Sequence, residues 1–190
     1  MMNNMIESVL FITEQIQSNL EILAWITLIL WGIFFINQAL GQRLLFLGII
    51  PRKIYGLPGI LFAPLLHANF NHLFFNTIPL LVLSAFLLVH GLPYFMMVTL
   101  LITMISGILI WCFAKSGLHV GASAVITGFW GLLITDIYQE GSATAILLGI
   151  ISLYYFAGIF FGIFPSKRGV SWEGHLFGLF AGIATAFILP

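Results

Sequence analysis

GLHVGASA, residues 117–124, is a short polar break between two long apolar runs of the chain. The run before it ends near Phe113, and the run after it begins at Ser123. A serine in that position is usually only a helix N-cap. Ser123 gains interest when the chain is followed outward from it, because other apolar runs also begin with polar side chains.

The composition is that of a protein embedded in lipid. Of the 190 residues, 61% are hydrophobic and 6% charged, and the mean hydropathy is +1.14, whereas a soluble domain carries about 25% charged residues. So few charges cannot cover a globule with a hydrated surface, and we predict an integral membrane protein. The formal net charge is zero, which gives no indication of a nucleic-acid partner. Cys112 is the single cysteine, so no intrachain disulfide is expected.

Residues 1–20 are predicted to form an amphipathic helix at the membrane interface, and residues 21–190 a membrane domain. Charged and amide side chains such as Glu7 and Glu14 interrupt the first segment, so it is not a span. Its apolar side chains recur near helical spacing, at Ile6, Val9, Leu10, Ile16 and Leu20. The segment lacks the basic start, apolar core and small-residue site of a cleavable signal peptide, so none is expected.

The membrane domain has room for about six spans, since a span takes about 20 helical residues. The fourth is short for a bilayer, which is tolerable only if other helices surround it. The connection over residues 42–66 is too broken for a span and too apolar for a solvated loop, so we expect it to fold against the bundle. The predicted spans are residues 22–36, 71–89, 94–113, 123–135, 143–164 and 172 to 190, with a loop at 165–169.

Three of these spans run in the same direction, and each begins with polar side chains. The second span carries His72 and Asn76, the fourth begins at Ser123, and the sixth carries His175 about one turn from its start. These groups should therefore lie at a similar depth on one side of the membrane. Polar groups within membrane spans are costly and usually functional, so this shared level predicts a site.

The residue types suit nucleophilic catalysis. A serine hydroxyl needs a base to take its proton, and His175 is the candidate base for Ser123. His175, Gly178 and Gly182 share one helix face, and a glycine face lets a neighbouring helix approach closely. If that neighbour is the fourth span, the imidazole can reach the hydroxyl.

An acyl-transfer site also needs donors for the oxyanion. His72 and Asn76, four residues apart, share a face of the second span, and the backbone N–H of Ser123 lies at a helix start, where it has no intrahelical partner. Glu173 precedes His175 by two residues and points elsewhere on the helix. We therefore predict a Ser–His dyad without a third acidic member.

These motifs resemble those of the rhomboid family of intramembrane serine proteases. They are HANFNHLFFN at residues 67–76, Gly121-Ala122-Ser123, and HLFG at residues 175–178 with Gly182. The resemblance extends from the first span to the end and is to the bacterial six-helix type. It implies an all-α, multi-pass protein of the bacterial inner membrane.

The resemblance also implies an activity. The expected reaction is the cleavage of a transmembrane protein substrate near the membrane surface, at a small residue, after the substrate helix unwinds locally. The implied machinery is the Ser123–His175 dyad, with His72, Asn76 and the Ser123 backbone N–H as the oxyanion hole. No metal, cofactor or nucleic acid is implied, and the sequence carries no signal for an oligomeric state.

Three positions depart from the family pattern. Ala124 follows the serine where the family usually has glycine, and Thr127 stands where many members have an aromatic side chain on the catalytic imidazole. Many members also carry a Trp-Arg pair in the first loop, where this chain has Leu57 to Ile60. None of these positions makes or breaks bonds in the implied reaction.

The charge distribution conflicts with the orientation that the resemblance implies. The resemblance places the site on the extracytoplasmic side, which we take as the expectation, whereas the positive-inside rule would place it in the cytoplasm. All six basic residues lie on the side of the polar helix starts, at Arg43, Arg52, Lys53, Lys115, Lys167 and Arg168.

Two other functions remain open. A membrane metal site or transporter would use the histidines of one side, namely His67, His72, His119 and His175, but His67 and His72 are five residues apart and face differently on a helix. A rhomboid-like pseudoprotease would bind membrane helices without cutting them, although such proteins typically lack the serine or histidine.

Outside the dyad, we expect His67 to brace the first loop by hydrogen bonding and His119 to be solvated.

Overall fold

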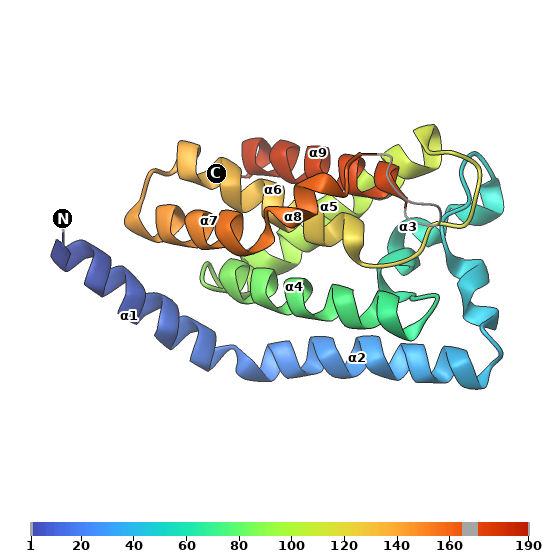
Figure 1. Cartoon of the computed structure of the whole chain (residues 1–190), viewed down its shortest axis with the longest axis horizontal. Coiled ribbons are helices and arrows are strands. Elements are labelled where there is room, and N and C mark those ends of the chain that lie inside the picture. Colours follow the sequence, from blue (N-terminus) through green and yellow to red (C-terminus); the bar gives the residue numbers. More distant parts are fainter. Residues whose placement is uncertain (1, 165–170, 190) are drawn as a thin grey trace.

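The computed structural model describes residues 2–164 and 171–189, and these residues are helical apart from turns, loops and one isolated β-bridge between Ile49 and His119. The prediction of an all-α fold is therefore confirmed. Figure 1 shows the helices lying roughly along one direction. In chain order they are α1 (Met2–Ser18), α2 (Leu20–Ala39), η1 (Arg43–Leu47), η2 (Ile54–Gly56), α3 (Gly59–Phe62), η3 (Ala63–Leu65), α4 (Phe70–Leu88), α5 (Leu92–Phe113), α6 (Ser123–Gln139), α7 (Ala143–Phe156), α8 (Gly158–Phe161) and α9 (Trp172–Ile188).

Among the described helices, α2, α4 and α5 are long and apolar enough to cross a membrane. The helices α6, α7 and α9 are shorter, at 17, 14 and 17 residues. Most side chains of α6 are buried, and it packs most extensively against α9. A helix enclosed in this way need not match the bilayer thickness by itself, because neighbouring helices shield its ends from lipid.

Several boundaries differ from the predicted ones. The predicted fourth span stops at Thr135, whereas α6 continues to Gln139. The predicted fifth span is divided at Ala157 into α7 and the short α8, and Gly158, which has low helix propensity, follows the division. The predicted loop at 165–169 lies outside the described residues.

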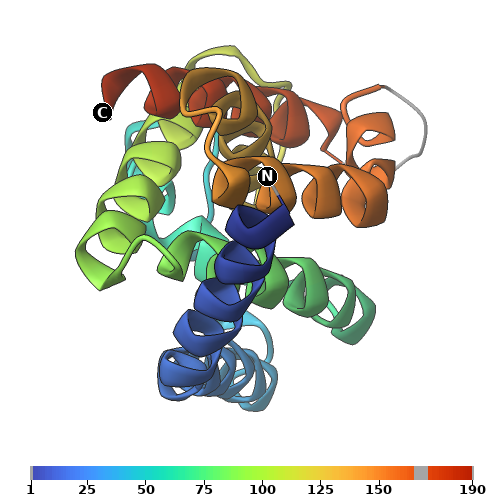
Figure 2. The same cartoon turned by 90° about the vertical axis from the view of Figure 1, so that its left-hand side faces the viewer.

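The N-terminal helix α1 forms within the predicted segment, and most of its apolar stripe faces away from the bundle. Only Asn19 separates it from α2, and it crosses the end of the bundle against α7 and α4 (Figure 2). Ile12 and Ile16 pack against the main core, whereas Ile6 and Leu10 of the predicted stripe are exposed. Because α1 crosses α7 and α4, its contact with them is short. Most of its apolar stripe therefore faces outward, where lipid can cover it.

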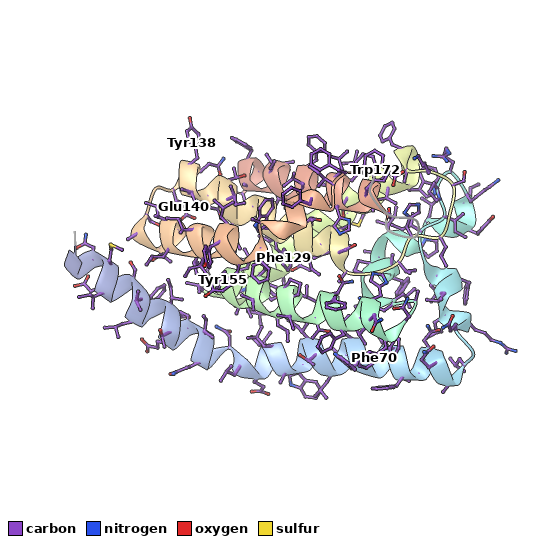
Figure 3. All side chains as sticks on the ribbon, in the orientation of Figure 1. Phe70, Phe129, Tyr138, Glu140, Tyr155 and Trp172 are labelled. Atoms are coloured by element: carbon purple, nitrogen blue, oxygen red, sulfur yellow. The ribbon has the colours of Figure 1, made fainter. Side chains whose placement is uncertain are left out.

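The helices α4, α6 and α9 all begin at the same end of the bundle (Figure 1). Trp172 and Phe70, at the starts of α9 and α4, lie at that end, and Glu140 and Tyr138 lie at the other (Figure 3). The polar helix starts therefore share one level, which is the arrangement that the direction of the spans predicts.

The connection between α2 and α4 folds against this end of the bundle in short helical turns. Its anchor is Arg52, whose guanidinium donates to the backbone oxygens of Cys112 and Ala114 at 3.3 and 2.7 Å. The indole N–H of Trp111 donates to the Lys53 backbone oxygen at 2.9 Å. The two Arg52 bonds satisfy carbonyls at the C-terminal end of α5, which have no partner within their own helix. The Trp111 bond runs the other way, from a donor on α5 to a carbonyl of the connection.

Candidate active site

One cavity of about 460 Å³ brings together the four side chains for which the sequence suggests chemistry. Ser123, His175, His72 and Asn76 all line it. They come from three different helices, α6, α9 and α4, that begin at this end. The remaining walls are the start of α4 and the segment that leads into α6.

Ser123 is the first residue of α6, and its hydroxyl is not used to cap the helix. The N-cap is Ala122, which makes no side-chain cap bond. No hydrogen bond to Ser123 Oγ is formed among the described residues, so the hydroxyl is available at the cavity wall. The backbone N–H groups of the first turn have no intrahelical acceptor, and they lie beside the hydroxyl at the positive end of the helix dipole.

His175 lies in the first turn of α9, and its ring is fixed through Nδ1. This nitrogen is 3.1 Å from the backbone oxygen of Ser171. A carbonyl oxygen can only accept, so we assign the proton of the neutral ring to Nδ1. The same assignment leaves Nε2 unprotonated, which is the form that a general base requires.

The close crossing of α6 and α9 depends on two glycines. A Cβ on Gly178 would collide with the Ala124 backbone oxygen and with Thr127 Oγ1, and a Cβ on Gly182 would collide with the Gly128 backbone. Small residues let helix backbones approach in this way. The approach keeps the start of α9, and with it His175, next to the start of α6.

Thr127, which stands where an aromatic side chain is common in the family that the sequence resembles, lies in the crossing of α6 and α9. Its side chain is buried and its hydroxyl donates to the backbone oxygens of Ser123 and Ala124, at 2.7 and 3.1 Å. It therefore packs in the α6–α9 crossing at Gly178, where it stiffens the first turn of α6.

His72 and Asn76 face the backbone that precedes Ser123. Gly121 has a φ of +114°, and a Cβ built there would lie 2.5 Å from His72 Nε2 and 3.4 Å from Asn76 Nδ2. Only glycine fits, for reasons of both backbone conformation and space. Asn76 Nδ2 is buried and has no hydrogen-bond partner among the described residues. A buried donor without an acceptor costs about 1–3 kcal/mol, so such a group calls for an explanation.

His67 supports His72 by ring packing. The two rings meet edge to face with centroids 5.1 Å apart, and His67 is buried at 1% exposure. Burial, and then the charge of the neighbouring His72, lowers the pKa of His67 to about 4 against a smaller opposing effect of the Leu65 carbonyl. Neither ring nitrogen makes a well-formed hydrogen bond within the described part of the chain. The prediction that His67 braces the loop by hydrogen bonding is therefore wrong, because packing holds it.

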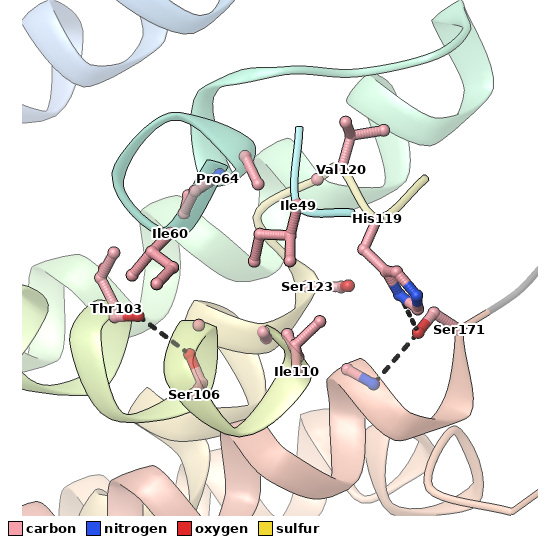
Figure 4. Close-up of a pocket in the computed structure, with 15 residues that line it drawn as sticks. Ile49, Ile60, Pro64, Thr103, Ser106, Ile110, His119, Val120, Ser123 and Ser171 are labelled. Carbon is pink, nitrogen blue, oxygen red and sulfur yellow. Dashed lines mark hydrogen bonds between the residues drawn. The ribbon is translucent and has the colours of Figure 1, made fainter. Parts of the chain in front are cut away.

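The sequence predicts a solvated His119, whereas the structure shows it half-buried with both ring nitrogens in contact with other residues. Its Nδ1 is 2.9 Å from Ser171 Oγ, and its Nε2 is 3.0 Å from the Lys115 backbone oxygen. Figure 4 shows this contact beside a small cavity of about 30 Å³ that Ser123 also lines. Sequence reasoning missed Ser171 altogether. Its position directly before the sixth span is an N-cap signal, but that signal does not reveal the contact with His119.

The histidines of this end do not assemble into a metal site. Within residues 2–164 and 171–189, no three His, Cys, Asp or Glu side chains come together in a way that could hold a metal ion.

Comparisons with known proteins identify the family. The family model of the Rhomboid domain matches residues 54–190. An uncharacterized protein of Mycobacterium bovis is 38% identical over 170 residues, which cover 85% of this chain and 71% of that protein. An uncharacterized protein of Mycobacterium leprae is 36% identical over 141 residues, which cover 69% of this chain and 55% of that protein. The chain belongs to the rhomboid family.

Proposed function

We propose that this protein is an intramembrane serine endopeptidase. Ser123 is the nucleophile and His175 the general base. His72, Asn76 and the backbone N–H of Ser123 form the oxyanion hole. The observation that carries the proposal is the buried amide of Asn76, a donor without an acceptor among the described residues. It lines the same cavity as Ser123 and His175, and Nδ1 of His175 lies against the Ser171 carbonyl.

The proposed reaction proceeds in two halves. His175 Nε2 takes the proton of Ser123 Oγ as the oxygen attacks the scissile carbonyl, and the resulting oxyanion accepts hydrogen bonds from the three donors. His175 then gives the proton to the leaving amine nitrogen, and the C–N bond breaks to leave an acyl-enzyme. In the second half, His175 takes a proton from water as the water oxygen attacks the ester carbonyl. The C–O bond to Ser123 then breaks, the carboxyl product is released, and His175 returns the proton to Ser123 Oγ.

The proposed substrate is a transmembrane protein that is cut near the membrane surface. The cavity lies where α4, α6 and α9 begin, at one end of the bundle. A substrate helix has to unwind locally to reach Ser123, because a helical backbone hides its carbonyls in hydrogen bonds. The small cavity beside Ser123 has room for about one water-sized group, about 30 Å³, which favours a small side chain at the cleaved bond. The proposed topology is six spans in the bacterial inner membrane.

A fluorophosphonate probe tests the proposal against the pseudoprotease alternative. The probe phosphonylates a serine only when a base activates it. We expect folded protein in detergent to be labelled, the label to disappear in Ser123→Ala, and the rate to fall sharply in His175→Ala. Folded wild-type protein that takes no label would favour a pseudoprotease.

A further inference from the structure

We infer that Ser171 and His119 form a positioning pair that holds the imidazole of His175 in the tautomer and orientation of a general base. The inference rests on the proposed function, because it assigns these two residues a role in the same reaction. Neither residue bonds the nucleophile, so both act through His175.

Ser171 contacts α9 in two ways that together fix the position of the ring. Its hydroxyl oxygen accepts from the backbone N–H of Gly174 at 3.2 Å and so caps the helix. Its backbone oxygen accepts from Nδ1 of His175 at 3.1 Å. A shift of Ser171 would therefore move both the first turn of α9 and the acceptor that orients the imidazole.

His119 holds Ser171 from the other side, and the donors and acceptors form a consistent chain. The Lys115 carbonyl can only accept, so Nε2 of neutral His119 donates to it at 3.0 Å. Nδ1 is then an acceptor and takes the hydroxyl proton of Ser171 at 2.9 Å. The Ser171 hydroxyl thus donates to Nδ1 of His119 while its oxygen accepts from the Gly174 N–H. Every donor in this series of hydrogen bonds therefore meets an acceptor.

The backbone of His119 is held in place by two further hydrogen bonds. Its N–H donates to the Ile49 carbonyl at 2.9 Å, and its carbonyl accepts from the Ile49 N–H at 3.0 Å. Ile49 is buried in a small apolar cluster against α5 and α6. These hydrogen bonds therefore connect His175 to the packed part of the bundle. The bond between His119 and Ser171 joins residues that are 52 positions apart in the sequence.

The Ser171 carbonyl contacts Nδ1 of His175, the ring nitrogen that an aspartate contacts in a catalytic triad. Such an aspartate fixes the tautomer of the histidine and orients its ring. Here a backbone carbonyl accepts the Nδ1 proton, and a carbonyl has to be held in place by other groups. The nearest acid in sequence, Glu173, is buried, and its Oε1 has no hydrogen-bond partner among the described residues.

The test compares turnover in Ser171→Ala, Ser171→Thr and His119→Ala with the wild type, using a model transmembrane substrate. Ser171→Ala keeps the carbonyl but loses both bonds of the hydroxyl, and we expect kcat to fall about tenfold while KM is unchanged. Ser171→Thr keeps a hydroxyl that can cap and should restore most of kcat. His119→Ala should match Ser171→Ala, and the double variant should lose no more than either single variant.

The matched control is Ser142→Ala. Ser142 is the N-cap of α7 and accepts from the Ala145 N–H at 3.0 Å, so its loss should lower the melting temperature about as much as Ser171→Ala. We expect kcat to be unchanged in this control. An equal loss of kcat in Ser142→Ala, no rescue by threonine, or additive losses in the double variant would each overturn the positioning role.

The fluorophosphonate label separates this inference from the proposed function. Failure of the wild type to label would refute the proposed function itself. Labelling of Ser171→Ala at the wild-type rate, while Ser123→Ala takes no label, would leave the protease assignment standing and overturn the inference. We expect Ser171→Ala to label about tenfold more slowly than the wild type.

Discussion

The side-chain amide of Asn76 is a buried donor that the fold itself does not use. In the proposed reaction its acceptor appears only when the oxyanion forms, so its hydrogen bond belongs to the transition state. Groups of this kind raise kcat without stabilising the protein. Substitution of Asn76 should therefore reduce turnover without reducing the stability of the fold.

For Asn76→Ala we expect kcat to fall about 100-fold and the free energy of unfolding to stay equal to the wild type or to rise. The comparison variant is Asn37→Ala. Asn37 Nδ2 is also buried without a partner, but its Oδ1 accepts from the Leu44 N–H at 2.9 Å, so its loss should cost about 1 kcal/mol of stability. Turnover and denaturation of both variants check this. A large loss of stability in Asn76→Ala would show that the amide serves the fold.

His67 should make stability depend on pH. Its pKa is about 4 in the fold against 6.5 for the unperturbed group, so between these values the unfolded chain binds more protons. The stability contributed by neutral His67 is complete above about pH 6.5 and is lost as the pH falls toward 4, by about 1–3 kcal/mol. We expect His67→Phe to lose less stability than the wild type between pH 7.5 and 4.5 in denaturation experiments. Equal losses would show that other groups control this dependence.

At the scale of residues, the sequence identified the side chains of the proposed reaction better than the residues that hold them in place. Ser123, His175, His72 and Asn76 stand out because polar groups at span starts are costly, and the structure gathers them at one cavity. Ser171 does not stand out, and His119 does so only as a candidate metal ligand. A capping serine looks alike at every helix start, and their bond joins segments whose proximity depends on the tertiary fold.

At the scale of elements, the glycines of α9 make α6 and α9 a single packing unit. A methyl group on Gly182 would meet the carbonyl of Gly128 on α6, and a backbone carbonyl cannot rotate away as a flexible side chain can. The two helices would have to separate. The distance between His175 and Ser123 would then change, although neither residue is altered.

We therefore expect Gly182→Ala to cost about 1–3 kcal/mol of stability and to reduce kcat at least tenfold. Gly32→Ala is the matched control. Gly32 lies within α2 with nothing within 4 Å of an added Cβ, so alanine should be neutral or stabilise by up to about 1 kcal/mol. Thermal denaturation and turnover distinguish the two. If both substitutions behave alike, the α6–α9 crossing is looser than described.

The elements also show where prediction from sequence ends. Hydropathy located the long helices, because a continuous apolar run is a local property. It extended the fifth span through Ala157, where the chain divides into α7 and α8. It placed an apolar stripe on α1 that is mostly exposed in the structure, but it did not indicate which side chains of α1 pack against the core. Such contacts depend on which neighbour a helix meets, which no local pattern contains.

At the scale of the whole molecule, the rhomboid domain and the apolar helices make this an integral membrane protein. The described basic residues, Arg43, Arg52, Lys53 and Lys115, belong to loops or short turns at the end with the candidate site. Two of them are engaged there, since Arg52 caps α5 and Lys115 lies 5.7 Å from the centre of the Trp172 ring. Charges used in this way are weak guides to orientation, so we propose that the site faces the extracytoplasmic side.

Cysteine labelling on intact cells tests this orientation. In a background with Cys112→Ser, the exposed positions Ser116 and Gly141 serve as reporters. Ser116 lies in the loop before the start of α6 and Gly141 directly after the end of α6, so they lie at opposite ends of the bundle. We expect Ser116→Cys to react with a membrane-impermeant maleimide on intact cells and Gly141→Cys to react only after lysis. The reverse pattern would place the site in the cytoplasm, as the positive-inside rule suggests.

The central claim is that Ser123 and His175 cut a transmembrane substrate, and the most direct measurement is the cleavage of a model substrate in proteoliposomes with the cut bond mapped by mass spectrometry. We predict one main cut near the membrane surface, after a small residue, that is absent with Ser123→Ala and with His175→Ala. Cleavage that persists in Ser123→Ala, or no cleavage by folded wild-type protein, would contradict the account.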